Sequence, residues 1–207
     1  EKEILLREIH HRVKNNLQII TGLLELQESL HSNKETGNIV LEVQGRIKSM
    51  ALIHEMLYRD NDLSKINLQD YAHNLIDGIE SGFHFNSYKV NKEINLQKAY
   101  LHIDTIIPLG LIMNELVSNA YKYVFSTQKE NTLRITINKV NNNEWKLVLS
   151  DNGPGLPQES SGIRGDSFGL KLVKMLCRQL KGDIEYRNNH GAEFSIIFNE
   201  LNQNLYK

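Results

Sequence analysis

The chain has 207 residues, of which 40% are hydrophobic and 24% charged, and its formal net charge is −1. This length allows one large domain or two small ones, and the near-zero charge gives no reason to expect nucleic acid or an anionic membrane surface as a partner. The single cysteine, Cys177, excludes an internal disulfide framework, and no apolar run is long enough to span a membrane. The chain opens inside an amphipathic pattern without a signal peptide, so we expect a fragment of a longer protein. We expect this fragment in the cytoplasm, and the full-length protein can still carry a sensor or a membrane-anchored part.

Up to residue 57 the sequence predicts two long amphipathic helices. Apolar side chains recur at steps of three and four in two segments, which places each set on one helical face, and residues 31–34 between them are typical of a turn. The first stripe consists of Leu6, His10, Val13, Leu17, Ile20 and Leu24, and the second of Ile39, Val43, Ile47, Met50, Ile53 and Leu57. A lone helical hairpin leaves both stripes half exposed, so we expect two copies to pair as a four-helix bundle.

Residues 59–62 interrupt this pattern and predict a domain boundary, so the expected domains are residues 1–62 and 66–201. The second domain is predicted to contain both helices and strands. In chain order these are a helix at 68–79, a strand at 88–96, a helix at 105–125, strands at 133–137 and 145–149, a polar loop at 156–166, a helix at 168–180, and a hairpin of 184–186 with 193–198. An open sheet with helices on one face is the natural α+β arrangement of these elements.

The predicted helix at 105–125 carries polar residues in an otherwise very apolar sequence. Glu115 and Asn119 are four residues apart and share a face, and Lys122 follows on the same side. A carboxylate and an amide oxygen suit Mg²⁺ held jointly with nucleotide phosphates, and the lysine suits a phosphate. Polar residues at such a spacing ordinarily form only a solvated helix face. However, polar groups on so apolar a helix need partners, which favours a binding site.

A second candidate site follows the predicted strand at 145–149. Asp151 begins the sequence Asp-Asn-Gly-Pro-Gly, and a carboxylate at a strand end can accept a hydrogen bond from an exocyclic amine such as that of adenine. Gly153 and Gly155 would let the backbone approach a flat ligand. The same residues are strong turn formers, so a plain turn is an equal alternative.

Residues 165–170, with the sequence Gly-Asp-Ser-Phe-Gly-Leu, open the last predicted long helix. Small residues at a helix N-terminus can bind phosphate through free N–H groups, and Gly169 and Leu170 are therefore candidate nucleotide-binding residues. Asp166 or Ser167 can equally cap the helix, and the two interpretations are compatible. The sequence contains no Walker-type phosphate loop.

The order of these segments resembles the Bergerat-fold ATP-binding domain of sensor histidine kinases. The resemblance lies in the succession of an asparagine-containing helix, an Asp-x-Gly-x-Gly turn, a short lid and a Phe-Gly-Leu helix. Residues 6–18, with the sequence LREIHHRVKNNLQ, resemble the dimerisation and phosphoacceptor domain of the subfamily whose acceptor lies in a His-Arg-x-x-Asn motif. Residues 46–58 resemble the second helix of that domain. The implied fold is a helical hairpin followed by an α+β ATP-binding sandwich.

The resemblance also implies roles for individual residues. In the nucleotide site Asn119 would hold Mg²⁺, and Glu115 would occupy the place of the catalytic glutamate of related ATPases. Lys122 and Tyr123 would contact phosphate and nucleoside. Asp151 would contact the adenine amine, and the pocket wall would be formed by Gly153 and Gly155.

The chain departs from the family pattern in three places. The glycine-rich box before the last long helix is reduced to Gly165 and Gly169, and Ala192 stands where a hydroxyl residue is common. Arg12 follows the acceptor, where the larger kinase subfamily has an acidic residue. Glu8 and Glu115 are therefore both candidates for the general base.

His11 is the predicted phosphoacceptor. His10 falls on the apolar stripe and should face the bundle interior, whereas His11 is rotated by roughly 100° to the flank, and it is His11 that occupies the histidine of His-Arg-x-x-Asn. Asn15 lies four residues after His11, on the same face, where its amide could position a water against a phosphoryl group on a docked receiver. An ordinary solvated residue is the alternative for Asn15.

The sequence thus predicts an ATP-dependent protein histidine kinase core that uses Mg²⁺, forms a homodimer and passes its phosphoryl group to an aspartate of a response regulator. One alternative is a non-catalytic phosphotransfer scaffold with a decayed pocket, against which Asn119, Lys122 and Asp151 argue. Another is an ATPase that drives a clamp. Glu115 would permit this activity, but the histidine-bearing hairpin would then have no role.

Overall fold

The structure is a computed structural model that describes Val13, which is helical, and residues 34–59, 65–83, 89–125, 130–156 and 168–201. Its elements are α2 (Lys34–Arg59), β1 (Lys65–Asn67), α3 (Leu68–Gly82), β2 (Val90–Leu96), β3 (Tyr100–His102), α4 (Ile103–Tyr123), β4 (Asn131–Lys139), β5 (Glu144–Asp151), α5 (Phe168–Gln179), β6 (Asp183–Asn188) and β7 (Ala192–Asn199). Every helix and strand expected beyond residue 38 is confirmed, with ends that differ by a few residues.

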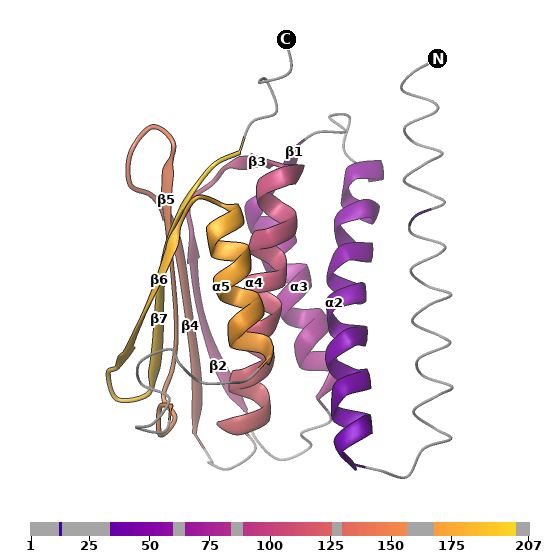
Figure 1. Ribbon diagram of the computed structural model, residues 1–207, viewed down its shortest axis with the longest axis vertical. Coiled ribbons are helices and arrows are strands. Elements are labelled where there is room, and N and C mark those ends of the chain that lie inside the picture. The colour runs from indigo at the N-terminus through magenta and orange to yellow at the C-terminus, as the bar shows by residue number, and fades with distance from the viewer. Residues whose placement is uncertain are drawn as a thin grey trace.

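A five-stranded mixed sheet forms one layer of the molecule, with the strand order β2-β4-β5-β7-β6. β2 and β4 are parallel, and the other neighbours are antiparallel. In Figure 1 α3, α4 and α5 lie on one face of this sheet, and α2 packs against α3 and α4 on the side away from it. The predicted α+β sandwich, with helices on one face of an open sheet, is therefore confirmed.

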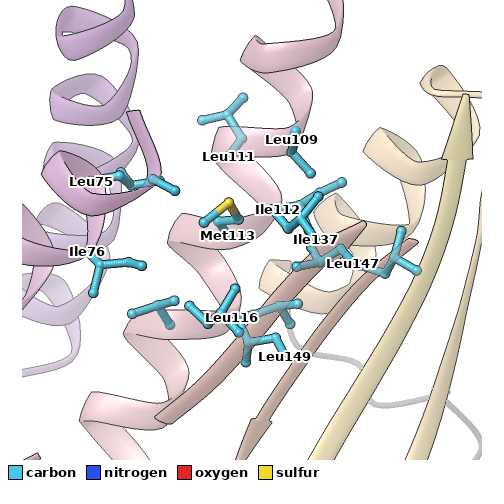
Figure 2. Close-up of a cluster of buried hydrophobic side chains, with 14 of the residues drawn as sticks. Leu75, Ile76, Leu109, Leu111, Ile112, Met113, Leu116, Ile137, Leu147 and Leu149 are labelled. Carbon is cyan, nitrogen blue, oxygen red and sulfur yellow. The ribbon is translucent and has the colours of Figure 1, made fainter. Parts of the chain in front are cut away.

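The core lies between the sheet and α4. Figure 2 shows Ile112 and Leu116 of α4 directed toward the sheet, where Ile137, Leu147 and Leu149 meet them. On its opposite side α4 packs against α3. Most residues of α4 between Thr105 and Val117 are buried. The sequence of this segment is apolar on all sides, which is typical of a helix surrounded by protein, and α4 is buried accordingly.

A small second sheet aligns α3 with α4. β1 and β3 pair antiparallel, with Lys65 opposite His102. Each of these strands runs directly into a helix whose first turn is capped by a side chain of the strand's last residue. Asn67 Oδ1 accepts from the amides of Gln69 and Asp70, and His102 Nδ1 accepts from the amide of Asp104. The two helices therefore begin side by side. This sheet was not predicted, because three-residue strands are too short to show alternation.

α2 confirms the second helix of the expected hairpin, but its buried side differs from the predicted stripe. Ile53 and Met56 are buried, and so are two polar residues, Gln44 and Ser49, which are 4% and 2% exposed. Three stripe residues stay only half buried, namely Val43, Ile47 and Met50. The first helix of the hairpin, apart from Val13, lies outside the described residues. Among the helices that the structure describes, none combines the length and the apolar character needed to cross a membrane.

Candidate nucleotide site

Three of the predicted site residues gather on one face of α4. Glu115, Asn119 and Lys122 all line a cavity of about 150 Å³ between α2, α3 and α4. Their spacing of four and three residues therefore does place them together, as the sequence predicted. The remaining lining residues are Gln44, Gly45 and Lys48 of α2, Gly78, Ile79 and Gly82 of α3, Phe83 after it, and Asn114 and Ser118 of α4.

Glu115 is paired with Arg46 of α2. The Arg46 Nε donates to Glu115 Oε1 at 2.5 Å, across 69 residues of sequence. The two side chains are 16% and 5% exposed, so this is a largely buried ion pair. The other carboxylate oxygen, Oε2, lies against α5, because a Cβ added to Gly169 would come within 2.6 Å of it. The Glu115 carboxylate thus joins three helices at one point.

Sequence reasoning missed the role of Arg46. It placed Arg46 in the segment that resembles the second helix of the phosphoacceptor domain and assigned it no partner. The signal was Glu115 itself, because a carboxylate on so apolar a helix must be paired or coordinated when it is buried. The partner could not be chosen by spacing, since the two residues lie in different segments of the chain.

Asp151 lies at the end of β5, as predicted, and its orientation is set by backbone amides. Oδ1 accepts hydrogen bonds from the amides of Gly153 at 2.9 Å and Ala192 at 3.2 Å. Burial raises the pKa of the Asp151 carboxyl above its ordinary value, although these two hydrogen bonds partly counteract the shift. Within the described residues no group donates a hydrogen bond to Oδ2 of Asp151, so this oxygen can accept one from a ligand.

The glycines of the Asp-Asn-Gly-Pro-Gly segment are needed for close packing. A Cβ on Gly153 would come within 2.5 Å of Val124, which follows α4. Gly155 has φ of +77°, a left-handed conformation that L side chains rarely adopt. The segment is thus a tight turn whose backbone contacts the end of α4. This geometry is compatible with both interpretations of the segment, a plain turn and the wall of a nucleotide pocket.

The predicted site residues fall into two groups. Glu115, Asn119 and Lys122 line the cavity that faces α2 and α3. Asp151 and its two glycines lie at the end of the central strand β5, next to Val124, and do not line that cavity. Tyr123, between the groups, is 67% exposed, and Leu170 is buried in the core. The end of α4 is therefore the point at which the two groups approach each other.

Several predicted residues lie outside the described part of the chain. These are Glu8, His10, His11 and Asn15 of the first helix, and Gly165, Asp166 and Ser167 before α5. Within the described residues there is no group of three or more His, Cys, Asp and Glu side chains that could hold a metal ion.

The fold and the arrangement of α4 with the Asp151 turn define an ATPase domain of the histidine kinase type. Residues 8–82 match the family described as "Histidine kinase", and residues 104–202 match the family described as "Histidine kinase-, DNA gyrase B-, and HSP90-like ATPase". The chain belongs to the histidine kinase family. The resemblance inferred from the motifs is thereby confirmed.

Known relatives cover nearly all of this chain. It is 33% identical over 177 residues to the sensor histidine kinase PdtaS of Mycolicibacterium smegmatis, covering 84% of this chain and 35% of that protein. It is 32% identical over 193 residues to PdtaS of Mycobacterium tuberculosis, covering 90% and 37%. The chain thus spans about a third of the length of these curated relatives.

A solved structure supports the fold independently. The histidine kinase domain of the Erythrobacter litoralis EL346 blue-light activated histidine kinase has a TM-score of 0.69 and 18% identity, and the match covers 93% of this chain and 89% of that domain. At this identity the likeness concerns the fold alone. It covers the same succession of a helical segment and an α/β sandwich.

Proposed function

We propose that this chain is the core of an ATP-dependent protein histidine kinase, with residues 1–62 as dimerisation and phosphoacceptor domain and residues 66–201 as catalytic domain. The observation that carries the proposal is the convergence of Glu115, Asn119 and Lys122 on one face of α4, with Asp151 fixed by two amides beyond its end. This is the arrangement expected of a nucleotide held by its base at one end and by its phosphates at the other.

The nucleotide base would bind at the Asp151 turn. Asp151 Oδ2 would accept the exocyclic amine of adenine, because Oδ1 is already engaged by two amides. Gly153 and Gly155 would form the pocket wall, and Tyr123 would contact the nucleoside. Gly169 and Leu170, at the start of α5, would lie near the phosphates, because the dipole of a helix favours negative charge at its N-terminus.

Mg²⁺ fits the donor set at α4 only in part. Asn119 offers an amide oxygen beside the cavity, and nucleotide phosphates would supply further ligands. Glu115 can join as a ligand or a base only if it leaves Arg46, because Oε1 accepts the guanidinium hydrogen bond. When bound, Mg²⁺ would offset charge on the triphosphate. Lys122 would contribute to the same task as a second positive charge.

The phosphoryl group would pass from ATP to His11 and then to an aspartate of a response regulator receiver domain. Asn15 would assist removal of the phosphoryl group from that receiver. Val43 and Ile47 on α2 are only partly buried, which supports pairing of two copies through the hairpin, because such a face is stabilised by a partner.

Incubation with γ-labelled ATP tests the proposal. Wild-type protein should acquire acid-labile label, His10→Gln should retain it and His11→Gln should lose it, provided that both variants are folded. Free phosphate without labelled protein would indicate an ATPase instead, and absence of both would indicate a scaffold. Label that persists in His11→Gln but disappears in His10→Gln would show that the acceptor was assigned to the wrong histidine.

A further inference from the structure

The carboxylate of Glu115 is held by two helices other than its own. Oε1 accepts a hydrogen bond from Nε of Arg46 in α2 at 2.5 Å. Oε2 packs against the start of α5, because a Cβ added to Gly169 would lie 2.6 Å from it. The side chain is only 5% exposed, so it has little contact with solvent. Its orientation is therefore set by α2 and α5 rather than by water.

The position of Glu115 on α4 would suit it to activate water against a bound nucleotide. It lies on the same face as Asn119 and Lys122, to which the proposed function assigns the metal and the phosphates. A carboxylate placed there can accept the proton of a water whose oxygen attacks the γ-phosphorus. The bond from that phosphorus to the bridging oxygen breaks, ADP leaves with the electron pair, and inorganic phosphate forms. Such hydrolysis consumes ATP without labelling a histidine.

The ion pair with Arg46 opposes this reaction in two ways. It occupies Oε1 with a charge-assisted hydrogen bond, so that this oxygen is not available to a water. Proton uptake by Glu115 would also cancel the negative charge that faces the guanidinium, which is unfavourable because the two side chains are only 16% and 5% exposed. Both effects depend on the packing of α2 against α4, since the two residues are 69 positions apart.

We propose that Arg46 determines the specificity of the reaction: it keeps Glu115 from activating water, so that the terminal phosphoryl group of ATP goes to histidine and not to hydrolysis. The inference rests on the proposed function, because it requires ATP at α4. Arg46 acts through Glu115 and not on the substrate, so it is a positioning residue. In Arg46→Met with His11 intact, fewer phosphoryl groups should therefore reach histidine for each ATP consumed.

Release of inorganic phosphate from ATP in the presence of Mg²⁺ tests this inference. The full chain is assayed in a His11→Gln background, so that no phosphate comes from breakdown of a phosphohistidine at that position. Arg46→Met should release phosphate at least about tenfold faster than this background, because a positioned general base contributes roughly 10²–10⁴-fold to such a step. Damage to the fold would lower the rate rather than raise it, and retained fluorescence of the buried Trp145 shows that the protein is folded.

Three variants in the same background make the test specific. Arg46→Lys keeps a charged donor for Glu115 and should hold the rate within about twofold of the background. Arg46→Met combined with Glu115→Gln should lose the added hydrolysis, because the amide oxygen of glutamine does not take a proton from water. Arg134→Met removes an arginine from an exposed pair with Glu93, so it should change the rate by less than about twofold.

The outcomes separate this inference from the proposed function. Wild-type protein that acquires no acid-labile label from ATP would refute both. Labelled wild-type protein, together with an unchanged rate of phosphate release in folded Arg46→Met, would overturn the inference alone. Faster release that persists after Glu115→Gln would also overturn it, because another group would then activate the water. If Arg46→Met does not fold, Arg46→Gln replaces the charge by a neutral donor and should still raise the rate about threefold, and an unchanged rate there would equally overturn the inference.

Discussion

Removal of Arg46 from α2 should destabilise the packing around α4, although the two helices lie far apart in the sequence. In Arg46→Met, the Glu115 carboxylate, 5% exposed, would lose its 2.5 Å partner and remain as a buried charge. Breaking one side of a buried ion pair costs about 3–5 kcal/mol, and we expect the lower end because the Arg46 side chain retains 16% exposure.

Trp145 provides the assay for this prediction. It is the only tryptophan of the chain, it lies in β5, and it is 2% exposed, so its fluorescence reports unfolding of the sheet. Urea unfolding followed at Trp145 should show a loss of about 3 kcal/mol in Arg46→Met. The double variant Arg46→Met with Glu115→Gln should recover most of this loss, because a neutral side chain no longer needs the cation.

Two results would refute this reasoning. A loss below about 1 kcal/mol in Arg46→Met would show that α2 does not hold Glu115 in solution, since surface ion pairs contribute no more than that. Simple addition of the two single-variant effects in the double variant would show that the two residues are not coupled. Arg134→Met is a suitable control, because Arg134 also pairs with a glutamate but is 55% exposed, and it should change stability little.

Two other substitutions test the core and the nucleotide site. Asp151→Asn should weaken ATP binding at least tenfold, because the amide presents a donor to the adenine amine, yet it should raise the free energy of unfolding at pH 7. The sign follows from the raised pKa of the folded carboxyl: ionisation of Asp151 disfavours the folded state, so the gain should disappear as pH falls below about 4, where the carboxyl is protonated in both states. Gly110→Ala should destabilise the protein by about 1–3 kcal/mol despite the better helix propensity of alanine, because the new methyl group would collide with the buried Tyr71 hydroxyl. Chemical denaturation of Gly110→Ala in the wild-type background and in a Tyr71→Leu background decides this, because the Tyr71 ring carbons would also lie within 3.0 Å of the new methyl group. An equal loss in both backgrounds would show that the collision is not the cause.

Local spacing determined most of the secondary structure. The alternation at residues 133–137 and 145–149 identified β4 and β5, and the unbroken apolar character of residues 106–117 identified a helix buried on all sides. These patterns are local because the period of a strand or helix is set by its own backbone geometry. The motifs around Asn119 and Asp151 indicated the family for a similar reason, since each is a short contiguous segment.

Only the tertiary structure decided how distant segments meet. The pairing of β1 with β3 aligns α3 and α4, and the contact of Arg46 with Glu115 joins residues 69 positions apart. The burial of Gln44 likewise follows from the docking of α2 rather than from its apolar stripe. No periodicity in the sequence encodes such contacts, because they depend on which surfaces pack after chain closure. Contiguous motifs therefore identified the family and named the candidate site residues at the end of α4, whereas packing brings an arginine and a lysine of α2 beside them.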